Sequence, residues 1–247
     1  MTPTLAVLIP IYNEETALTE LLDAVEQQPE VSEIVIVDDG SSDRTPQILA
    51  ARTFRVPVQL LRHPTNRGKG AAIRTAIDAA TSEFAVIQDA DLEYDPRDYP
   101  VLLEPFRRTG VTVVYGSRSF SAHSAYSFWF VMGNKLVTLF TNVLFNSYIS
   151  DMETCYKMMP LSLWRALDLR ADRFDIEPEI TGKLLRGRHR IYEVPISYAA
   201  RSREEGKKLT WQDGVYALFT LTRIRIRPRP ALPRKAPARD DAQKPVR

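Results

Sequence analysis

The chain has 247 residues and a formal net charge of +2; 44% of its residues are hydrophobic and 26% are charged. This composition is typical of a soluble globular protein with a core of normal size, and so small a net charge gives no reason to expect nucleic acid as a partner. The single cysteine, Cys155, excludes an internal disulfide framework, fits a reducing cytosol and is expected to be a small buried residue.

The first half of the chain alternates short apolar runs with amphipathic segments. The apolar runs are rich in β-branched residues, as are strands of a parallel sheet that is covered on both faces. We predict strands at 5–10, 33–39, 56–61 and 84–91, and helices between them at 15–27, 46–52 and 70–80. This alternation predicts a doubly wound α/β fold, with a mainly parallel sheet flanked by helices.

The second half is less regular. We predict a strand at 111–118, a helix at 174–187, a strand-like segment at 190–198 and an apolar helix at 209–224. The proline-rich stretch 228–247 is expected to be a disordered tail, so that the folded domain covers 4–227. The N-terminus lacks a basic region followed by an apolar run of signal length, and we therefore expect no secretory signal.

A long apolar stretch lies at 124–149. Its length could span a bilayer, but polar side chains interrupt it at a frequency that is costly in hydrocarbon. The interrupting residues are Asn134, Lys135, Thr138, Thr141, Asn142 and Asn146. We predict an interfacial or partly buried helix here, and a core helix is the alternative.

Three carboxylates alternate at the end of the predicted strand 84–91. They are Asp89, Asp91 and Glu93. Ligands of open α/β sheets bind beyond the carboxyl ends of the strands, and crowded carboxylates repel one another unless a cation neutralises them. Mg²⁺ and Mn²⁺ take carboxylate oxygens and keep positions for phosphate oxygens. The pattern indicates a divalent metal site, with a solvated acidic turn as the alternative.

Two other predicted strands end in polar residues. Asp39 could accept hydrogen bonds from a base or a ribose, although its neighbours Ser42 and Asp43 also fit a turn and a helix cap. After the first strand, Tyr12 offers an aromatic face and Glu14 an acceptor. Segment 66–70 lacks the spacing of a phosphate-binding loop, and no dinucleotide fingerprint follows the first strand. Three polar strand ends on one sheet predict a common crevice.

The motifs, taken as a set, resemble a known enzyme family. They are IPIYNEE, VIVDDGSSDRT, NRGKGAAIRTAI, IQDADLEYDP, YGSR, SDMETCYKM, FDIEPEI, YEVPISY and EEGKKLTWQDG. In this order they resemble the inverting glycosyltransferases of family two, which have the Rossmann-like, nucleotide-sugar-binding GT-A fold. The resemblance covers 5–224. It is strongest to the branch that contains dolichyl-phosphate mannose synthases and polyprenyl-phosphate glucosyltransferases.

The resemblance implies a role for each matching residue. Those that would hold the nucleotide sugar are Pro10, Tyr12, Glu14, Asp39, Lys69, Asp89, Ala90 and Asp91. The divalent metal, Mg²⁺ or Mn²⁺, would lie on Asp91 and Glu93. The acceptor phosphate would meet Arg118, Arg201 and Lys207, and Asp151 would lie near the donor sugar. Catalysis would then depend on Asp91, Arg118 and Asp151.

The resemblance also implies partners and a location. The donor would be of the GDP-mannose or UDP-glucose type, and the acceptor a polyprenyl phosphate. The enzyme would then be cytoplasmic and peripheral at the inner face of the membrane. Two departures affect the acceptor: Asn134 and Lys135 stand where mannose synthases carry a second arginine, and no transmembrane helix follows Ile224. The sequence does not indicate an oligomeric state.

Three alternative functions would require different residues. A soluble or cell-wall hydroxyl acceptor would need a general base, for which Asp151 is the natural candidate. A non-catalytic nucleotide-sugar-binding protein is expected to have a broken acidic triplet, yet Asp89, Asp91 and Glu93 are all present. A nucleotidyltransferase would need a basic, glycine-rich loop after the first strand, where the acidic YNEE stands.

Overall fold

The centre of the protein is one seven-stranded sheet. The computed structural model describes residues 4–120, 128–200 and 211–233. The strands run in the spatial order β3-β2-β1-β4-β6-β5-β7. Their bounds are β1 Leu5–Ile11, β2 Val31–Asp38, β3 Val58–Arg62, β4 Phe84–Ile87, β5 Val114–Ser117, β6 Lys157–Pro160 and β7 Tyr192–Pro195.

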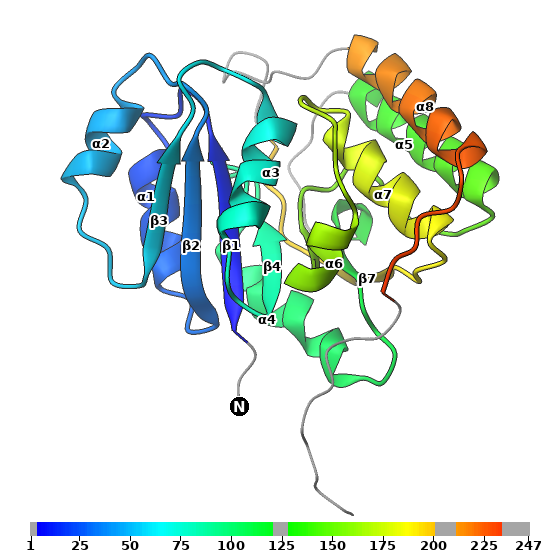
Figure 1. Ribbon diagram of the computed structural model, residues 1–247, viewed down its shortest axis with the longest axis horizontal. Coiled ribbons are helices and arrows are strands. Elements are labelled where there is room, and N and C mark those ends of the chain that lie inside the picture. Colours follow the sequence, from blue (N-terminus) through cyan, green and yellow to red (C-terminus); the bar gives the residue numbers. More distant parts are fainter. Residues whose placement is uncertain (1–3, 121–127, 201–210, 234–247) are drawn as a thin grey trace, which may run out of the picture.

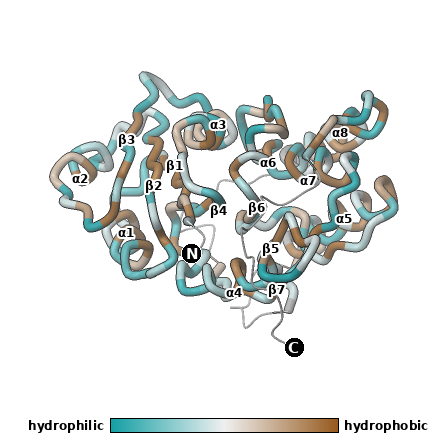
Figure 2. The backbone as a smooth tube through the Cα atoms, turned by 60° about the horizontal axis from the view of Figure 1, so that its bottom comes forward, coloured by the Kyte–Doolittle hydropathy of each residue, from teal (hydrophilic) through white to brown (hydrophobic). Residues whose placement is uncertain are grey.

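Helices cover both faces of this sheet (Figure 2). The α-helices are α1 Leu18–Glu26, α2 Thr45–Ala51, α3 Lys69–Ala79, α4 Tyr99–Leu103, α5 Phe128–Phe145, α6 Leu161–Ala166, α7 Ile176–Arg186 and α8 Trp211–Ile226. Short 3₁₀ turns are η1 Pro96–Asp98, η2 Glu104–Arg107 and η3 Arg118–Phe120. In Figure 2, α3, α6 and α7 lie on one side of the strands, and α1 and α4 on the other.

The direction of each strand determines which of its two ends lies at a given edge of the sheet. β1, β2, β3 and β4 pair in parallel, and Figure 1 shows them side by side. β6 pairs antiparallel with both β4 and β5, while β5 and β7 are parallel. The expected mainly parallel sheet flanked by helices is confirmed. The reversed strand β6 was not predicted; its direction brings the segment before Lys157 to the edge at which the other strands end.

The first-half strands formed where the apolar runs predicted them. Every side chain of Leu5–Ile9 is fully buried, as expected for a strand covered on both faces. β4 is shorter than predicted, because it ends at Ile87 and not at 91. Gln88 still donates its N–H to Leu8 O at 2.9 Å, after which the backbone turns and Leu92 adopts a positive φ of 60°. The acidic triplet therefore lies in a turn beyond the strand.

The helix in the long apolar stretch has two different faces. Three of its polar side chains, spaced four residues apart, point inward. Thr138 Oγ1 accepts from Met152 N at 3.2 Å, and Asn142 Nδ2 donates to Ile149 O at 2.8 Å. The third, Asn134, reaches Asp151. The residues that interrupt the apolar pattern thus hold segment 149–152.

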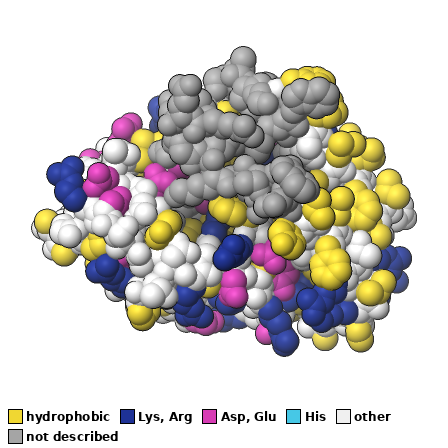
Figure 3. Space-filling view, turned by 90° about the horizontal axis from the view of Figure 1, so that it is seen from above, with side chains coloured by type: hydrophobic (Ala, Val, Ile, Leu, Met, Phe, Trp, Pro, Cys, Tyr) yellow, Lys and Arg dark blue, Asp and Glu magenta, His cyan; other side chains and the backbone are white. Residues whose placement is uncertain are grey.

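The opposite face of α5 is apolar and exposed. Val137, together with Ile149 and Met152, forms a small core with residues of α8. Outside it, large apolar side chains face away from the protein. On α5 and α8 these are Phe128, Leu136, Leu139, Val143, Val215, Tyr216, Phe219 and Ile226. They gather at the right of Figure 3, over α5 and α8. In the described ranges 4–120, 128–200 and 211–233, no helix combines the length and apolarity that crossing a bilayer requires.

Candidate active site

Polar side chains from five strands converge at the carboxyl edge of the sheet. The residues that follow β1, β2, β4 and β5 lie at this edge, together with the segment that precedes the reversed strand β6. This is the edge at which open α/β sheets bind ligands. Hydrogen bonds and ion pairs described below connect these segments to one another, and this strand-end region corresponds to the crevice expected from the sequence.

The acidic triplet follows β4 in a strained turn. Leu92 is a non-glycine residue in the left-handed region, where sterically unfavourable conformations persist only if the surroundings hold them. Glu93 N donates to Asp91 Oδ1 at 3.1 Å. Burial, together with the negative charges of Asp89 and Glu93, raises the pKa of Asp91 to about 7. The turn thus holds carboxylates closer together than they would stay without a counter-charge.

A divalent cation fits two of these carboxylates. In the described part of the chain, no group of three or more His, Cys, Asp or Glu side chains forms a cage for a metal. The available ligands are Asp91 and Glu93, because Asp89 is already paired with a lysine. Mg²⁺ commonly binds to one or two carboxylates and takes its other oxygens from substrate phosphates and water. The residues present therefore fit a metal that arrives with a diphosphate.

Lys69 joins the triplet to α7. Its Nζ lies 2.7 Å from Asp89 Oδ1 and 3.3 Å from Glu177 Oε1, and Glu177 is also paired with the fully buried Lys157. Burial alone would lower the pKa of Lys69, but the charges of Asp89 and its neighbours raise it well above its ordinary value. Lys69 is therefore a permanent cation next to the triplet. Glu177, which completes this network, was not singled out from the sequence, although it lies in the motif FDIEPEI.

Asp39 supports a loop instead of facing the crevice. Its Oδ1 lies 2.6 Å from His63 Nδ1 and accepts from Arg67 N at 3.0 Å, while Oδ2 accepts from Gly68 N at 2.7 Å. The side chain is only 3% exposed. Gly40 beside it has a φ of 74°, and a Cβ there would lie 2.6 Å from Thr65 C. A direct contact between Asp39 and a nucleoside stays a prediction; in the structure the carboxylate fixes segment 66–68.

The loop after β1 remains open to solvent. Tyr12 is exposed, and Pro10 and Glu14 are half-buried. Asn13 has a positive φ of 54°, which asparagine tolerates, and its N–H donates to Ser41 Oγ at 3.0 Å. Glu14 N donates to Thr45 Oγ1 at 3.1 Å. The backbone after β1 is thus held against the turn after β2, while the side chain of Tyr12 is exposed.

Arg118 and Asp151 form a buried, two-pronged ion pair that connects the end of β5 to the segment before β6. Arg118 Nε donates to Asp151 Oδ2 at 2.6 Å, and Arg118 Nη2 donates to Oδ1 at 2.8 Å. Asn134 Nδ2 donates to the same Oδ1 at 3.2 Å. The Arg118 side chain is 11% exposed and that of Asp151 only 1%. Burial alone would raise the pKa of Asp151, but Arg118 and Asn134 hold it below its ordinary value.

This geometry changes the role considered for Asp151. From the sequence it was the natural general base toward a hydroxyl acceptor. A base must hold a lone pair toward the proton it removes, and both Asp151 oxygens instead accept hydrogen bonds from neighbouring side chains. Its lowered pKa also disfavours proton uptake. In the structure Asp151 orients Arg118.

The remaining predicted residues are one nucleotide-sugar candidate, two acceptor candidates and the cysteine. Ala90 is buried in the turn of the acidic triplet. Arg201 and Lys207 lie outside the described residues. Cys155 is buried, as predicted.

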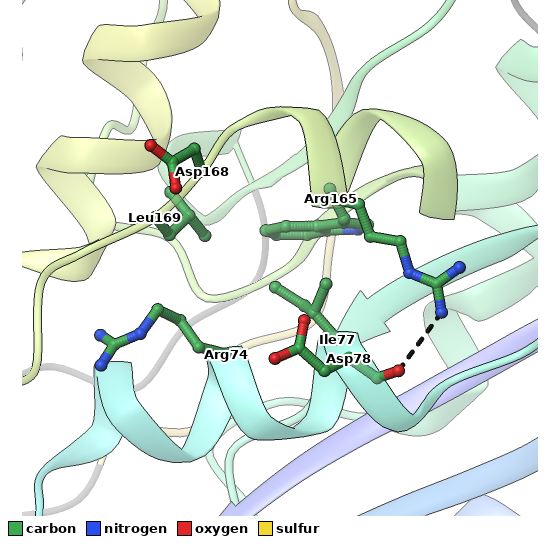
Figure 4. Close-up of a pocket in the computed structure, with 7 residues that line it drawn as sticks. Arg74, Ile77, Asp78, Arg165, Asp168 and Leu169 are labelled. Atoms are coloured by element: carbon green, nitrogen blue, oxygen red, sulfur yellow. Dashed lines mark hydrogen bonds between the residues drawn. The ribbon is translucent and has the colours of Figure 1, made fainter.

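A solvent-facing pocket lies away from this crevice. It is bounded by α3, by α6 and by the residues that follow α6 (Figure 4). Arg165 Nη2 donates to Asp78 O at 3.4 Å and to Ala80 O at 2.7 Å, and Arg74 is paired with Asp172 at 2.6 Å. Both guanidinium groups are thus bound to the protein itself, and we do not assign this pocket a function.

Comparisons with known proteins agree with this geometry. Residues 6–163 match the family model described as glycosyl transferase family 2. The chain is 28% identical over 208 residues to the low-salt glycan biosynthesis hexosyltransferase Agl6 of Haloferax volcanii, covering 82% of this chain and 49% of that protein. It is 27% identical over 209 residues to the dolichol-phosphate mannosyltransferase of Pyrococcus furiosus, covering 82% and 58%. The chain thus spans about half the length of these relatives.

A solved structure has a similar fold. It is glucosyl-3-phosphoglycerate synthase from Mycobacterium tuberculosis in complex with Mn²⁺, UDP and glucosyl-3-phosphoglycerate. The TM-score is 0.69 at 18% identity, over 90% of this chain and 80% of that one. Another structure of that synthase contains Mg²⁺ and UDP. At this identity the likeness concerns the fold alone.

The buried ion pair predicts an acid-dependent loss of stability. Asp151→Asn should lower the free energy of unfolding at pH 7 by about 3 kcal/mol, because it leaves a buried guanidinium without its counter-charge. The folded-state pKa of Asp151 lies below its ordinary value of 3.8, so the contribution is complete above that value and disappears as the pH falls through the folded pKa. The difference in urea unfolding between variant and wild type should therefore be constant above about pH 4 and begin to shrink only as the pH falls below it toward the folded pKa.

Asp172→Asn is the matched control for this measurement. It removes a pair with Arg74 whose acidic side chain is 63% exposed, and a change of less than about 1 kcal/mol is expected at pH 7. A difference for Asp151→Asn that is equally small, or that does not depend on pH, would contradict a buried pair with Arg118.

Proposed function

The chain belongs to glycosyl transferase family 2, and we propose that it transfers a hexose from a nucleotide-diphosphate sugar to a polyprenyl phosphate, with inversion at the anomeric carbon. The GT-A fold expected from the motifs is confirmed by the mainly parallel sheet and by the likeness to a solved glycosyltransferase. We take 4–227 as the catalytic domain. Of the tail predicted at 228–247, residues 234–247 lie outside the described part of the chain.

The proposal of a phosphate acceptor rests on one observation: both carboxylate oxygens of Asp151 already accept hydrogen bonds from Arg118 or Asn134. A hydroxyl acceptor needs a base to take its proton, whereas a phosphate monoester has a second pKa of about 6 and is already a dianionic nucleophile near pH 7. The structure provides a guanidinium, Arg118, whose Nε and Nη2 are held by Asp151, and Asn134 donates to the same carboxylate. A planar fork of donors suits phosphate oxygens. This arrangement supports an acceptor that brings its own negative charge.

The donor would bind on the other side of the crevice. A divalent cation on Asp91 and Glu93 would neutralise the diphosphate leaving group. Lys69, held between Asp89 and Glu177, adds a fixed positive charge nearby. The exposed ring of Tyr12 would stack on the nucleobase. The attacking phosphate on Arg118 and the leaving diphosphate would then lie on opposite sides of the sugar, as a single displacement requires.

One observation favours a second candidate, transfer to a hydroxyl. Burial raises the pKa of Glu153 to about 7, although the charge of Lys157 beside it acts in the opposite direction. A carboxyl group with such a pKa is suited to general base catalysis at neutral pH. Glu153 follows Asp151 by two residues in the segment before β6. If the acceptor is an alcohol, Glu153 and not Asp151 is the candidate base.

The exposed apolar face of α5 and α8 supports peripheral binding to a membrane. It comprises exposed side chains such as Leu136, Leu139 and Val143 on α5 and Tyr216 and Phe219 on α8, and exposed Arg223 and Arg225 follow in the last turn of α8. Apolar and aromatic residues next to cations suit the headgroup region of anionic lipid. A polyprenyl phosphate is dissolved in such a bilayer. We propose the cytoplasmic face, where nucleotide sugars are available.

The metal requirement predicts that Asp91→Asn removes Mn²⁺ binding. In the presence of UDP or GDP, electron paramagnetic resonance should show Mn²⁺ bound to the wild type and at least about tenfold weaker binding to the variant, because one of two carboxylate ligands is lost. Transfer should be abolished in the variant, and in the wild type by chelation. Asp95→Asn, in the same turn but bonded to Arg97, is the control. Full wild-type transfer in excess chelator would refute the metal requirement.

The acceptor assignment predicts a selective effect of Arg118→Lys. The variant keeps a counter-charge for Asp151 but loses the fork, so the KM for undecaprenyl phosphate should rise roughly 10- to 100-fold. Calorimetric affinity for the nucleoside diphosphate, measured without a divalent cation, should stay within a factor of two or so, since Arg118 is paired with Asp151 and not with the triplet. Parallel loss of both would place Arg118 on the donor side.

Membrane binding predicts that the protein floats with anionic liposomes at low salt. Leu139→Ser combined with Val143→Ser should reduce the floating fraction, because both side chains are exposed apolar groups, 58% and 76%. Leu60→Ser, at an exposed position on β3 far from this face, is the matched control. Added salt should also weaken binding by screening the arginines. A full-length protein that stays in the soluble fraction at low salt would contradict membrane binding.

A further inference from the structure

Tyr198 connects the two halves of the crevice. It follows β7 and forms an antiparallel bridge with Tyr94, the residue after the acidic triplet. The next residue, Ala199, donates its N–H to Glu93 O at 2.9 Å. The backbone that leaves β7 is therefore paired with the backbone of the triplet turn, and the two segments are separated by about a hundred residues in the chain.

The side chain of Tyr198 contacts a charged group on each side. Its hydroxyl donates to Glu93 Oε2 at 2.8 Å. The guanidinium carbon of Arg118 lies 5.0 Å from the centre of the Tyr198 ring, within the range of a cation–π contact. Tyr198 is 5% exposed, and the Tyr94 ring packs edge-on against it at 5.3 Å. One rigid, buried ring thus touches a predicted metal ligand and the predicted acceptor arginine.

The hydroxyl remains a donor at physiological pH. A phenol keeps its proton near neutral pH, so Tyr198 donates and the Glu93 carboxylate accepts. A partner of this kind fixes the direction of a metal-binding carboxylate, and loss of such partners typically weakens metal binding about 10- to 100-fold. A shift of Glu93 toward a bound cation would therefore move the Tyr198 hydroxyl, and the Tyr198 ring would in turn displace Arg118.

We propose that Tyr198 is a positioning residue that couples occupation of Asp91 and Glu93 by a divalent cation to the orientation of Arg118. Binding of the donor with its cation would then prepare the acceptor side, and by linkage the acceptor side would strengthen binding of the cation by the same factor. The proposal rests on the proposed function for the identity of the two ligands. The coupling itself runs through one side chain, from Glu93 at the Tyr198 hydroxyl to Arg118 at the Tyr198 ring.

The first test is Mn²⁺ affinity in the presence of a nucleoside diphosphate. UDP and GDP are compared by calorimetry, and the one that binds is used for Mn²⁺ titrations followed by electron paramagnetic resonance. Tyr198→Phe keeps the ring and its packing and removes only the hydroxyl. Mn²⁺ affinity should fall about tenfold. Tyr115→Phe, which removes the hydroxyl of a fully buried tyrosine bonded to Thr181, should not change it.

The second test is a double-mutant cycle between Tyr198→Phe and Arg118→Lys, measured as Mn²⁺ affinity. If Tyr198 transmits between the sites, Arg118→Lys weakens Mn²⁺ binding several-fold with Tyr198 present and has little effect beside Tyr198→Phe. The same effect of Arg118→Lys in both backgrounds overturns the coupling. Unchanged Mn²⁺ affinity in Tyr198→Phe also overturns it.

Neither titration depends on turnover, which separates this inference from the proposed function. A wild type that couples Mn²⁺ to Arg118 but glycosylates an alcohol instead of a polyprenyl phosphate supports the role of Tyr198 and refutes the acceptor. If the wild type binds Mn²⁺ no better than Asp91→Asn does, Asp91 is not a ligand of the cation, and both the metal site and the coupling are refuted.

Discussion

The arrangement of the crevice depends on one constraint: charges buried at the carboxyl edge of the sheet must be paired. Three cations there are matched to carboxylates, Lys69 to Asp89, Lys157 to Glu177 and Arg118 to Asp151. Within the described part of the chain, Asp91 and Glu153 are not matched to a cation in this way. Burial raises the pKa of each of these carboxyl groups to about 7. The excess negative charge lies where a cation and a diphosphate would enter.

Much of the fold could be predicted because buried parallel strands are nearly continuous apolar runs. β1, β2 and β4 lie where the sequence indicated, although β4 ends at Ile87, where the acidic turn begins. β6 has only four residues and no periodicity, and its antiparallel direction is a property of the sheet as a whole. That direction brings Asp151 to Arg118, so their pairing could not be foreseen from residues 33 positions apart.

The sequence shows which residue types follow each strand, but not the contacts that their side chains make. Motifs identified the acidic triplet, Arg118 and the strand ends, because residue type and position after a strand are visible in a sequence. Burial is not visible. Asp39 and Asp151 were assigned to ligand and catalysis, but their oxygens are engaged by His63 and a loop backbone in one case and by Arg118 in the other. Tyr198 and Glu177 matter through contacts that only the folded chain makes.

The most direct measurement compares two acceptors of equal chain length, undecaprenyl phosphate and undecaprenol, with GDP-mannose and UDP-glucose as donors and mass spectrometry of the lipid product. If Asp151 serves to hold Arg118 for an acceptor that is already ionised, a glycosyl phospholipid forms from the phosphate, and the alcohol is left unchanged. Glycosylation of the alcohol at a comparable rate would contradict a phosphate acceptor. Glu153 would then be the candidate general base.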